Sequence, residues 1–234
     1  MLIFLDTETT GLSAEDVICS IAFIDDENYE YELVNEGKKI SAEASSIHHI
    51  TNEMIKDTST FKKSSIYKYL EVHNRDSNTL VVHNIQFALE MLSKASFIWK
   101  GGVIDTLRVS KHLIAECEGF SLQLLRYELK LYKGEVKLQE QYGIKDALVA
   151  HNALSDALVT KLLFLYLKEM ASEEEMHSLS FKEVLLEKFS FGKHKGKYIE
   201  EVCINDTSYA RWLLVSDTDE DIKYSINHYL QGNE

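Results

Sequence analysis

The first dozen residues, MLIFLDTETTGL, constrain the fold most strongly, because an apolar run ends there in two acidic residues. Asp6 and Glu8 are two positions apart, and a β-strand places residues i and i+2 on the same face. Two carboxylates that converge at a strand end repel each other unless a cation neutralises them, and oxygen ligands of this kind suit Mg²⁺ or Mn²⁺. The sequence therefore predicts a divalent-metal site at the end of this strand. The alternative is an exposed strand end with two solvated acids.

A third carboxylate stands in the apolar stretch AHNALSDALVTKLLFLYL. Asp156 begins a stripe that continues at Thr160, Leu163 and Leu167 with the spacing of a helix, so this acid should face the core and needs a partner there. His151 lies five residues earlier, about 140° away on a helix that turns ~100° per residue. We therefore expect His151 to reach Asp156 only from the segment that leads into the helix.

These two motifs resemble a known family. The Asp6 and Glu8 motif, followed by Thr-Thr-Gly, and the His151 and Asp156 pair resemble the first and third motifs of the DEDDh exonucleases, the DnaQ-like branch of the ribonuclease H-like superfamily. The resemblance covers about residues 1–168. It implies an α/β fold with a ribonuclease H-like mixed sheet flanked by helices.

The second motif of that family departs from the expected pattern. The family has His-Asn-x-x-Phe-Asp, whereas this chain reads HNIQFA at 83–88, so that Ala88 replaces a metal-binding aspartate. Neither Gln86 nor Glu90 is a ready replacement, because two positions along a helix correspond to ~200° of rotation. Natural drift and a deliberate aspartate-to-alanine change would both account for Ala88.

The resemblance also implies a chemistry, phosphodiester hydrolysis from the 3′ end with two Mg²⁺ or Mn²⁺ ions. Asp6 would bridge both ions, Glu8 and Asp156 would complete the first, and His151 would take the proton of the attacking water. The aspartate expected at position 88 would help to hold the second ion. The second ion site is therefore expected to be weakened.

Further residues are candidates for contact with the terminal nucleotide. The chain after the first strand would turn at a glycine and present backbone N–H groups, and the following leucine would pack against a base. The alternatives are an ordinary turn for 9–12, and for His83 and Asn84 a role at the strand end or in positioning the next helix. The candidates are Thr9, Thr10, Gly11, Leu12, His83, Asn84 and Phe87.

Two pairs of residues are expected to be structural. His48 and His49 are adjacent and cannot share one face of a helix, so we expect surface residues rather than a metal pair. Trp99 and Trp212 are expected to be core or interface anchors.

The segment from Phe189, FSFGKHKGKYIEEVCINDTSYARWLL, resembles the small C-terminal module of exodeoxyribonuclease X-like proteins. Within KFSFGKHKGKY at 188–198, lysines are interleaved with aromatic residues and there is no acidic residue, a mixture that suits phosphates and stacked bases. Lys193, Lys195 and Lys197 are therefore possible phosphate contacts. The alternative is a solvated lysine turn over an aromatic core.

The order of elements predicts a mixed sheet. Three strand-like runs separated by polar turns favour an antiparallel meander, and later short strands that alternate with helices favour parallel pairing. The expected strands are 2–7, 17–24, 29–34, 80–82 and 103–105, and the expected helices include 51–57, 61–73 and 85–96.

The polar, acidic stretch ASEEEMHSLS suggests a boundary. We expect an exonuclease domain over 1–170, a linker over 171–180 and a C-terminal module over 181–234. No apolar run approaches the ~20 residues of a membrane span, and the N-terminus has no basic leader, so a cytoplasmic protein is expected.

Three functions remain open. The first is a metal-dependent 3′-to-5′ exonuclease that acts on DNA 3′ ends and is impaired by Ala88; a net charge of −13 argues against broad attraction to a polyanion but not against a local site. The second is a non-catalytic nucleic-acid-binding module on the same scaffold. The third is a haloacid dehalogenase-like phosphatase, whose nucleophile motif needs an aspartate where Glu8 stands.

Overall fold

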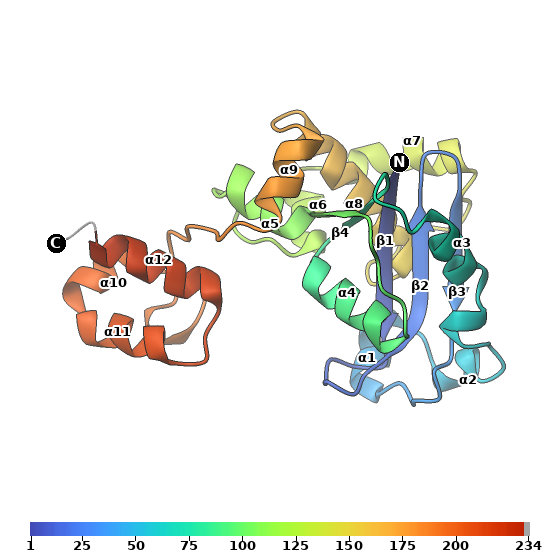
Figure 1. The fold of residues 1–234 in the computed structure, drawn as a ribbon, viewed down its shortest axis with the longest axis horizontal. Coiled ribbons are helices and arrows are strands. Elements are labelled where there is room, and N and C mark those ends of the chain that lie inside the picture. The colour runs from blue at the N-terminus through green and yellow to red at the C-terminus, as the bar shows by residue number, and fades with distance from the viewer. Residues whose placement is uncertain (232–234) are drawn as a thin grey trace. The chain divides into compact units, whose positions relative to one another are not determined.

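The computed structural model describes residues 1–231, and the chain divides into two compact units between Ser180 and Phe181. The first unit is built on a five-stranded sheet in the order β3-β2-β1-β4-β5 (Figure 1). β1, β2 and β3 are antiparallel, whereas β4 pairs parallel with β1 and β5 pairs parallel with β4. The strands are β1 (Leu2–Thr9), β2 (Ile18–Ile24), β3 (Tyr29–Leu33), β4 (Thr79–Val82) and β5 (Gly102–Asp105). The predicted mixed sheet flanked by helices is confirmed.

β1 is the central strand of the sheet, and its apolar residues are buried on both faces. Phe4 belongs to one buried cluster, while Ile3 and Leu5 belong to the other. This alternation is the two-residue period of a strand, and it places Asp6 and Glu8 on the face of Phe4.

Helices cover both faces of the sheet (Figure 1). On the side of Ile3 and Leu5 lie η1 (Phe61–Lys63), α3 (Ser65–His73) and α4 (Ile85–Lys94). On the side of Phe4 lie α5 (Thr106–Leu113), α6 (Leu122–Glu128), α7 (Tyr132–Tyr142), α8 (Ala153–Lys168) and α9 (Glu173–Leu179). Two short helices, α1 (Ala42–His48) and α2 (Asn52–Ile55), pack on a smaller cluster beside β2.

The stretch 171–180, expected to be a linker, contains α9 (Glu173–Leu179) and belongs to the first unit. Ser172 and Glu175 form a reciprocal capping box, and Met176 is fully buried. Acidic residues in a first turn satisfy exposed N–H groups and complement the helix dipole, so a polar, acidic run here marks a helix start.

The second unit is helical and has its own core. An antiparallel bridge pairs Lys188 with Tyr198, and the buried side chains include Phe189, Ile199 and Ile226. Its elements are η2 (Gly192–His194), α10 (Ile199–Asn205), α11 (Thr207–Val215) and α12 (Glu220–Gln231).

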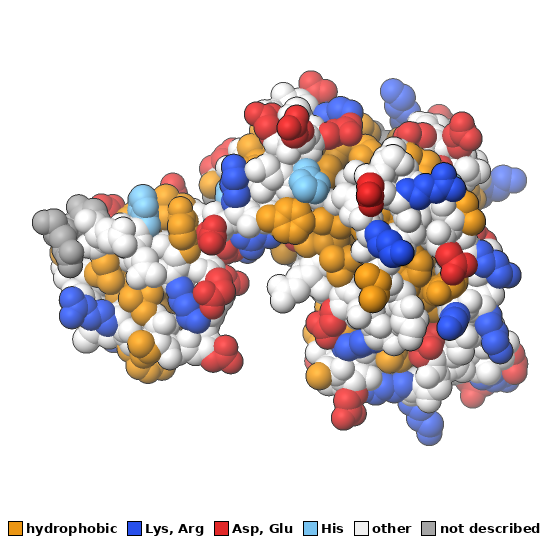
Figure 2. All heavy atoms as spheres, viewed as in Figure 1, with side chains coloured by type: hydrophobic (Ala, Val, Ile, Leu, Met, Phe, Trp, Pro, Cys, Tyr) orange, Lys and Arg blue, Asp and Glu red, His pale blue; other side chains and the backbone are white. Residues whose placement is uncertain are grey.

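Charged side chains of both signs are interspersed over the face of the first unit that Figure 2 shows. Within residues 1–231, no helix is both long and apolar enough to cross a bilayer.

Candidate active site

Three carboxylates from two elements converge at the C-terminal end of β1. Ligand atoms of Asp6, Glu8 and Asp156 all lie within 4.8 Å of one another. Phe4 fixes the face on which Asp6 and Glu8 project, and that face is the one α8 covers, with the Phe4 ring 5.3 Å from Phe164 of α8. The apolar stripe of α8 therefore brings Asp156 to the strand, as its position at the head of that stripe requires.

The cluster is electrostatically unfavourable without a cation. Burial, and then the charge of Asp156, raise the pKa of Glu8 to about 8, and burial raises the pKa of Asp156 to about 7. The pKa of Asp6 is also raised, by burial first and then by both neighbouring carboxylates. Three oxygen ligands at this spacing fit Mg²⁺ or Mn²⁺, whose positive charge would favour the ionised carboxylates.

The turn before α8 fixes Asp156. His151 has a left-handed backbone (φ 58°), and its N–H donates to Asp156 Oδ2 at 3.1 Å. The Asn152 side chain caps α8 by accepting from the backbone N–H of Ser155. The contact therefore comes from the segment before the helix, and it leaves the exposed His151 imidazole free to face the pocket.

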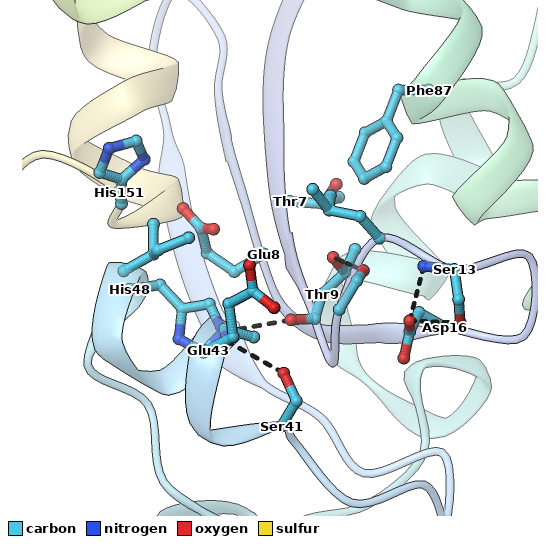
Figure 3. Close-up of a pocket in the computed structure, with 14 residues that line it drawn as sticks. Thr7, Glu8, Thr9, Ser13, Asp16, Ser41, Glu43, His48, Phe87 and His151 are labelled. Atoms are coloured by element: carbon cyan, nitrogen blue, oxygen red, sulfur yellow. Dashed lines mark hydrogen bonds between the residues drawn. The ribbon is translucent and has the colours of Figure 1, made fainter.

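A pocket of about 570 Å³ opens beside the carboxylates (Figure 3). In Figure 3, Glu8 and His151 lie on one side of the β1 end, and Phe87 lies on the other. Leu12 is 86% exposed at the rim. The predicted site residues that line this pocket are Glu8, Thr9, Gly11, Leu12, Phe87 and His151.

Three predicted substrate contacts have internal partners instead of a place in the pocket wall. The Thr10 hydroxyl donates to Asp16 Oδ1 at 2.6 Å. The ring nitrogens of His83 lie 3.0 Å from Thr106 Oγ1 and 2.8 Å from the Phe120 carbonyl. Asn84 accepts from the Phe87 backbone N–H as the N-cap of α4. The structure favours the strand-end and helix-positioning alternative for His83 and Asn84, because a buried imidazole and an open helix end both require partners.

Gly11 is explained by packing within its own loop. A Cβ atom at this position would lie 2.6 Å from Asp16 Oδ2, too close for any side chain. Asp16 also accepts from the Ser13 backbone and hydroxyl and pairs with Lys38. Glycine here lets the loop close around the Asp16 carboxylate at the pocket edge.

Ala88 lies in the first turn of α4, directly after Phe87, and is buried. Its methyl group belongs to the apolar cluster on the other face of the sheet, with Met91 and Leu92. The side chain of Ala88 has no atom that could bind a metal ion together with Asp6, Glu8 and Asp156.

His48 is buried, which corrects the expectation of a surface residue. Its Nδ1 accepts from the Ile50 N–H at 3.0 Å, so Nε2 carries the proton and donates to the Thr9 carbonyl at 3.1 Å. Burial lowers the pKa of His48. The available signal was the spacing of Ala44 and His48 on one face of a helix capped by Ser41, and α1 packs that face against the end of β1. His49 is exposed, as expected.

Other pocket residues were missed because they become neighbours only through the fold. Ser41 and Glu43 reach the pocket from the start of α1, while Ser13 and Asp16 reach it from the loop after β1. The sequence offers no periodic signal that would join these two segments.

In the second unit, the three candidate lysines differ. Lys193 pairs with Asp206 at 2.7 Å and lies over the Tyr209 ring, whereas Lys195 and Lys197 are exposed in the turn. This arrangement gives Lys193 an internal role and leaves the other two as candidates.

The two tryptophans also differ. Trp99 is a core residue of the first unit, as expected, whereas Trp212 is 58% exposed beside Tyr209.

Comparisons with known proteins agree with this geometry. A family model described as Exonuclease matches residues 3–164, and one described as Exodeoxyribonuclease X-like C-terminal matches residues 189–216. The chain is 28% identical to Exodeoxyribonuclease 10 of Escherichia coli strain K12, over 99% of this chain and 100% of that protein. It is also 28% identical to a DNA polymerase III subunit epsilon-like protein of Rhodobacter capsulatus, over 70% of this chain and 23% of that protein.

Solved structures show the same fold. Exonuclease X in complex with 5′ overhanging duplex DNA matches with a TM-score of 0.57 at 25% identity, over 77% of this chain and 99% of that one. A zinc-bound E. coli ExoI–ssDNA complex matches with a TM-score of 0.52 at 17% identity, over 76% of this chain and 42% of that one. The chain therefore belongs to the DnaQ-like exonuclease family, with a ribonuclease H-like fold and an exodeoxyribonuclease X-like C-terminal segment.

Proposed function

We propose that this protein is a divalent-metal-dependent 3′-to-5′ exonuclease of the DEDDh type that acts on DNA. The observation that carries the proposal is the convergence of Asp6, Glu8 and Asp156 beside a pocket that His151 lines. The choice of DNA is supported by the relative named Exodeoxyribonuclease 10 and by the DNA complex of Exonuclease X. Family membership favours this activity over the phosphatase alternative.

Each residue of the site has a proposed role in hydrolysis. Asp6, Glu8 and Asp156 would hold Mg²⁺ or Mn²⁺, which when bound supplies activation of the attacking water and stabilisation of the leaving oxygen. His151 would accept the proton of that water, since its imidazole is exposed at the pocket. Phe87, which lies across the strand end from Glu8 and His151 in Figure 3, and the exposed Leu12 at the pocket rim would contact the terminal base.

Ala88 sets the level of activity. It leaves the second ion without the carboxylate that the family's second motif supplies, so we propose a weak second site and slow turnover.

The direct test uses single-stranded DNA, duplex DNA with 5′ overhangs, and RNA, each labelled at either end. With Mn²⁺, a 5′ label should give a descending ladder, and a 3′ label should appear at once as a mononucleotide. Asp6→Ala and EDTA should both abolish release. A 5′-to-3′ ladder, or release that survives Asp6→Ala, would contradict the proposal.

A non-catalytic nucleic-acid-binding module is the second candidate, and Ala88 is the observation that favours it. The two candidates differ in one outcome. A protein that binds DNA with Mn²⁺ but releases no nucleotide over long incubation is the binding module.

For the C-terminal module, we propose that Lys195 and Lys197 contact DNA phosphates. Both are exposed in a turn whose glycines, Gly192 and Gly196, adopt positive φ, and Tyr198 is 51% exposed next to them. Cationic side chains beside an open aromatic ring are the combination that single-stranded nucleic acids bind.

A further inference from the structure

Asp156 is the end of a chain of polar side chains that runs through α6 into α7. Gln123 Nε2 donates to Asp156 Oδ1 at 2.6 Å, and Arg126 Nη1 donates to Gln123 Oε1 at 3.2 Å. Arg126 also makes two bonds to Glu135, from Nε to Oε1 at 2.6 Å and from Nη2 to Oε2 at 2.8 Å. Arg126 and Glu135 are both buried, at 5% and 9% exposure.

The donor and acceptor of each hydrogen bond between Asp156, Gln123 and Arg126 follow from the side chains' chemistry. A guanidinium group has donors only, so the atom of Gln123 that faces Arg126 must be the carbonyl oxygen Oε1. The amide nitrogen Nε2 then faces Asp156 and donates to it. Arg126 and the Asp156 carboxylate thus favour the same orientation of the Gln123 amide, and without Arg126 the amide loses the partner that holds its oxygen end.

Arg126 is in turn held by two directional hydrogen bonds to Glu135 as well as by the attraction between their charges. The two parallel bonds to Glu135 fix the plane of the guanidinium group, and α6, which carries Arg126, is anchored in the core by Leu122 and Leu125. The orientation of Glu135 is therefore passed through Arg126 and Gln123 to Asp156.

Both carboxylate oxygens of Asp156 are therefore oriented by residues other than Asp6 and Glu8. Oδ1 accepts from Gln123, and Oδ2 accepts from the His151 backbone. Each oxygen keeps a second lone pair that could bind a cation held between Asp156, Asp6 and Glu8. Partners of this kind are what hold a metal-binding carboxylate in place.

We propose that Gln123 and Arg126 are positioning residues of the metal site, which hold Asp156 in the orientation that binds the cation. This inference rests on the proposed function, because it requires that Asp156 binds a metal ion. A purely structural ion pair between α6 and α7 is the competing explanation. The two differ because a structural pair would change thermal stability without changing the affinity for metal.

The experiment measures Mn²⁺ affinity of the full chain by calorimetric titration, well below the melting temperature of each variant. Gln123→Met keeps the length of the side chain and removes the donor, and it should weaken Mn²⁺ binding about 10- to 100-fold. Gln139→Met is the matched control, since the half-buried Gln139 side chain donates to the Asp146 carbonyl, and this variant should bind Mn²⁺ as the wild type does.

A second variant tests Arg126 without leaving a charge buried alone. Arg126→Met combined with Glu135→Leu replaces the whole ion pair by apolar side chains, which proteins commonly tolerate. This double variant keeps Gln123 but frees its amide, so its Mn²⁺ affinity should also fall by about tenfold or more.

Each result has one meaning. Wild-type affinity in Gln123→Met would overturn the positioning role while leaving the proposed metal site intact. Wild-type affinity in the double variant would overturn the role of Arg126. If the Asp6→Ala variant binds Mn²⁺ as tightly as the wild type does, the proposed metal site is wrong, and the positioning role is wrong with it.

Discussion

At the scale of single residues, we expect Glu8 to link metal binding to stability. Its pKa rises from 4.5 to about 8 on folding, because of burial and the charge of Asp156. Between these values the folded chain holds a proton that the unfolded chain releases, so the free energy of unfolding must fall as pH rises through this window.

Thermal melting in EDTA should show this loss as a melting temperature that decreases from pH 5 to pH 8. Glu8→Gln keeps the shape and removes the titration, so its melting temperature should decrease less and exceed the wild-type value at pH 8. Mn²⁺ should raise the wild-type melting temperature at pH 8 and have less effect on the variant. Identical pH profiles for the two proteins would show that Glu8 is not held protonated by the fold.

Ala88 is the residue at which we predict that activity can be gained. Ala88→Asp should increase Mg²⁺-dependent release of nucleotides by about tenfold or more, because the second ion regains a ligand. In EDTA the same change should lower the melting temperature, because it adds a carboxylate to a buried position.

Ala95→Asp, at the C-cap of the same helix, is the control for added charge, and it should leave release unchanged. If Ala88→Asp stays inactive on every substrate yet binds DNA, the binding-module alternative gains. Adding His151→Ala to Ala88→Asp should remove most of the increase, since the proton acceptor is lost.

At the scale of elements, the start of α8 joins stability to the site. Asn152→Ala removes the side-chain acceptor for the Ser155 N–H and should cost about 1 kcal/mol, measured as a lower urea midpoint with an unchanged slope. Asn152→Asp keeps the cap and is the control. A loss of the same size in both variants would mean that the cap does not hold this turn.

The same element explains why the histidine and the aspartate can act together. A helix would hold His151 and Asp156 on different faces, but the left-handed turn at His151 directs its N–H to the carboxylate and its ring to the pocket. α8 then supplies rigidity through a fully buried stripe that includes Leu163 and Leu167.

At the scale of the whole molecule, net charge and local charge act in opposite directions. A chain of net charge −13 repels DNA at long range, so binding must depend on local cations and on the metal site. Lys195→Ala combined with Lys197→Ala should weaken single-stranded DNA binding and reduce the slope of log K against log salt by about 1.4, or ~0.7 per phosphate contact.

The matched control is Lys62→Ala with Lys63→Ala, which removes the same charge from an exposed turn of the first unit. A slope that falls equally in both double variants would assign the effect to net charge. An unchanged slope in the first would leave the two lysines as a solvated turn.

The features that depend on local periodicity could be predicted from the amino-acid sequence. The two-residue period of β1 placed Asp6 and Glu8 on one face, and the helical stripe beginning at Asp156 turned that acid inward. The second motif showed the absence of a carboxylate at Ala88. These results need only the geometry of one strand or one helix.

Which of these local features lie together in space depends on the packing of the folded chain. Gln123, Arg126 and His48 reach the site because α6 and α1 pack against α8 and β1, and no spacing within their own segments encodes that contact. The capped helix α9 was mistaken for a linker because a helix start and a solvated loop share the same polar composition. Long-range partners depend on how apolar faces pack, and that choice is made by the whole core rather than by any one segment.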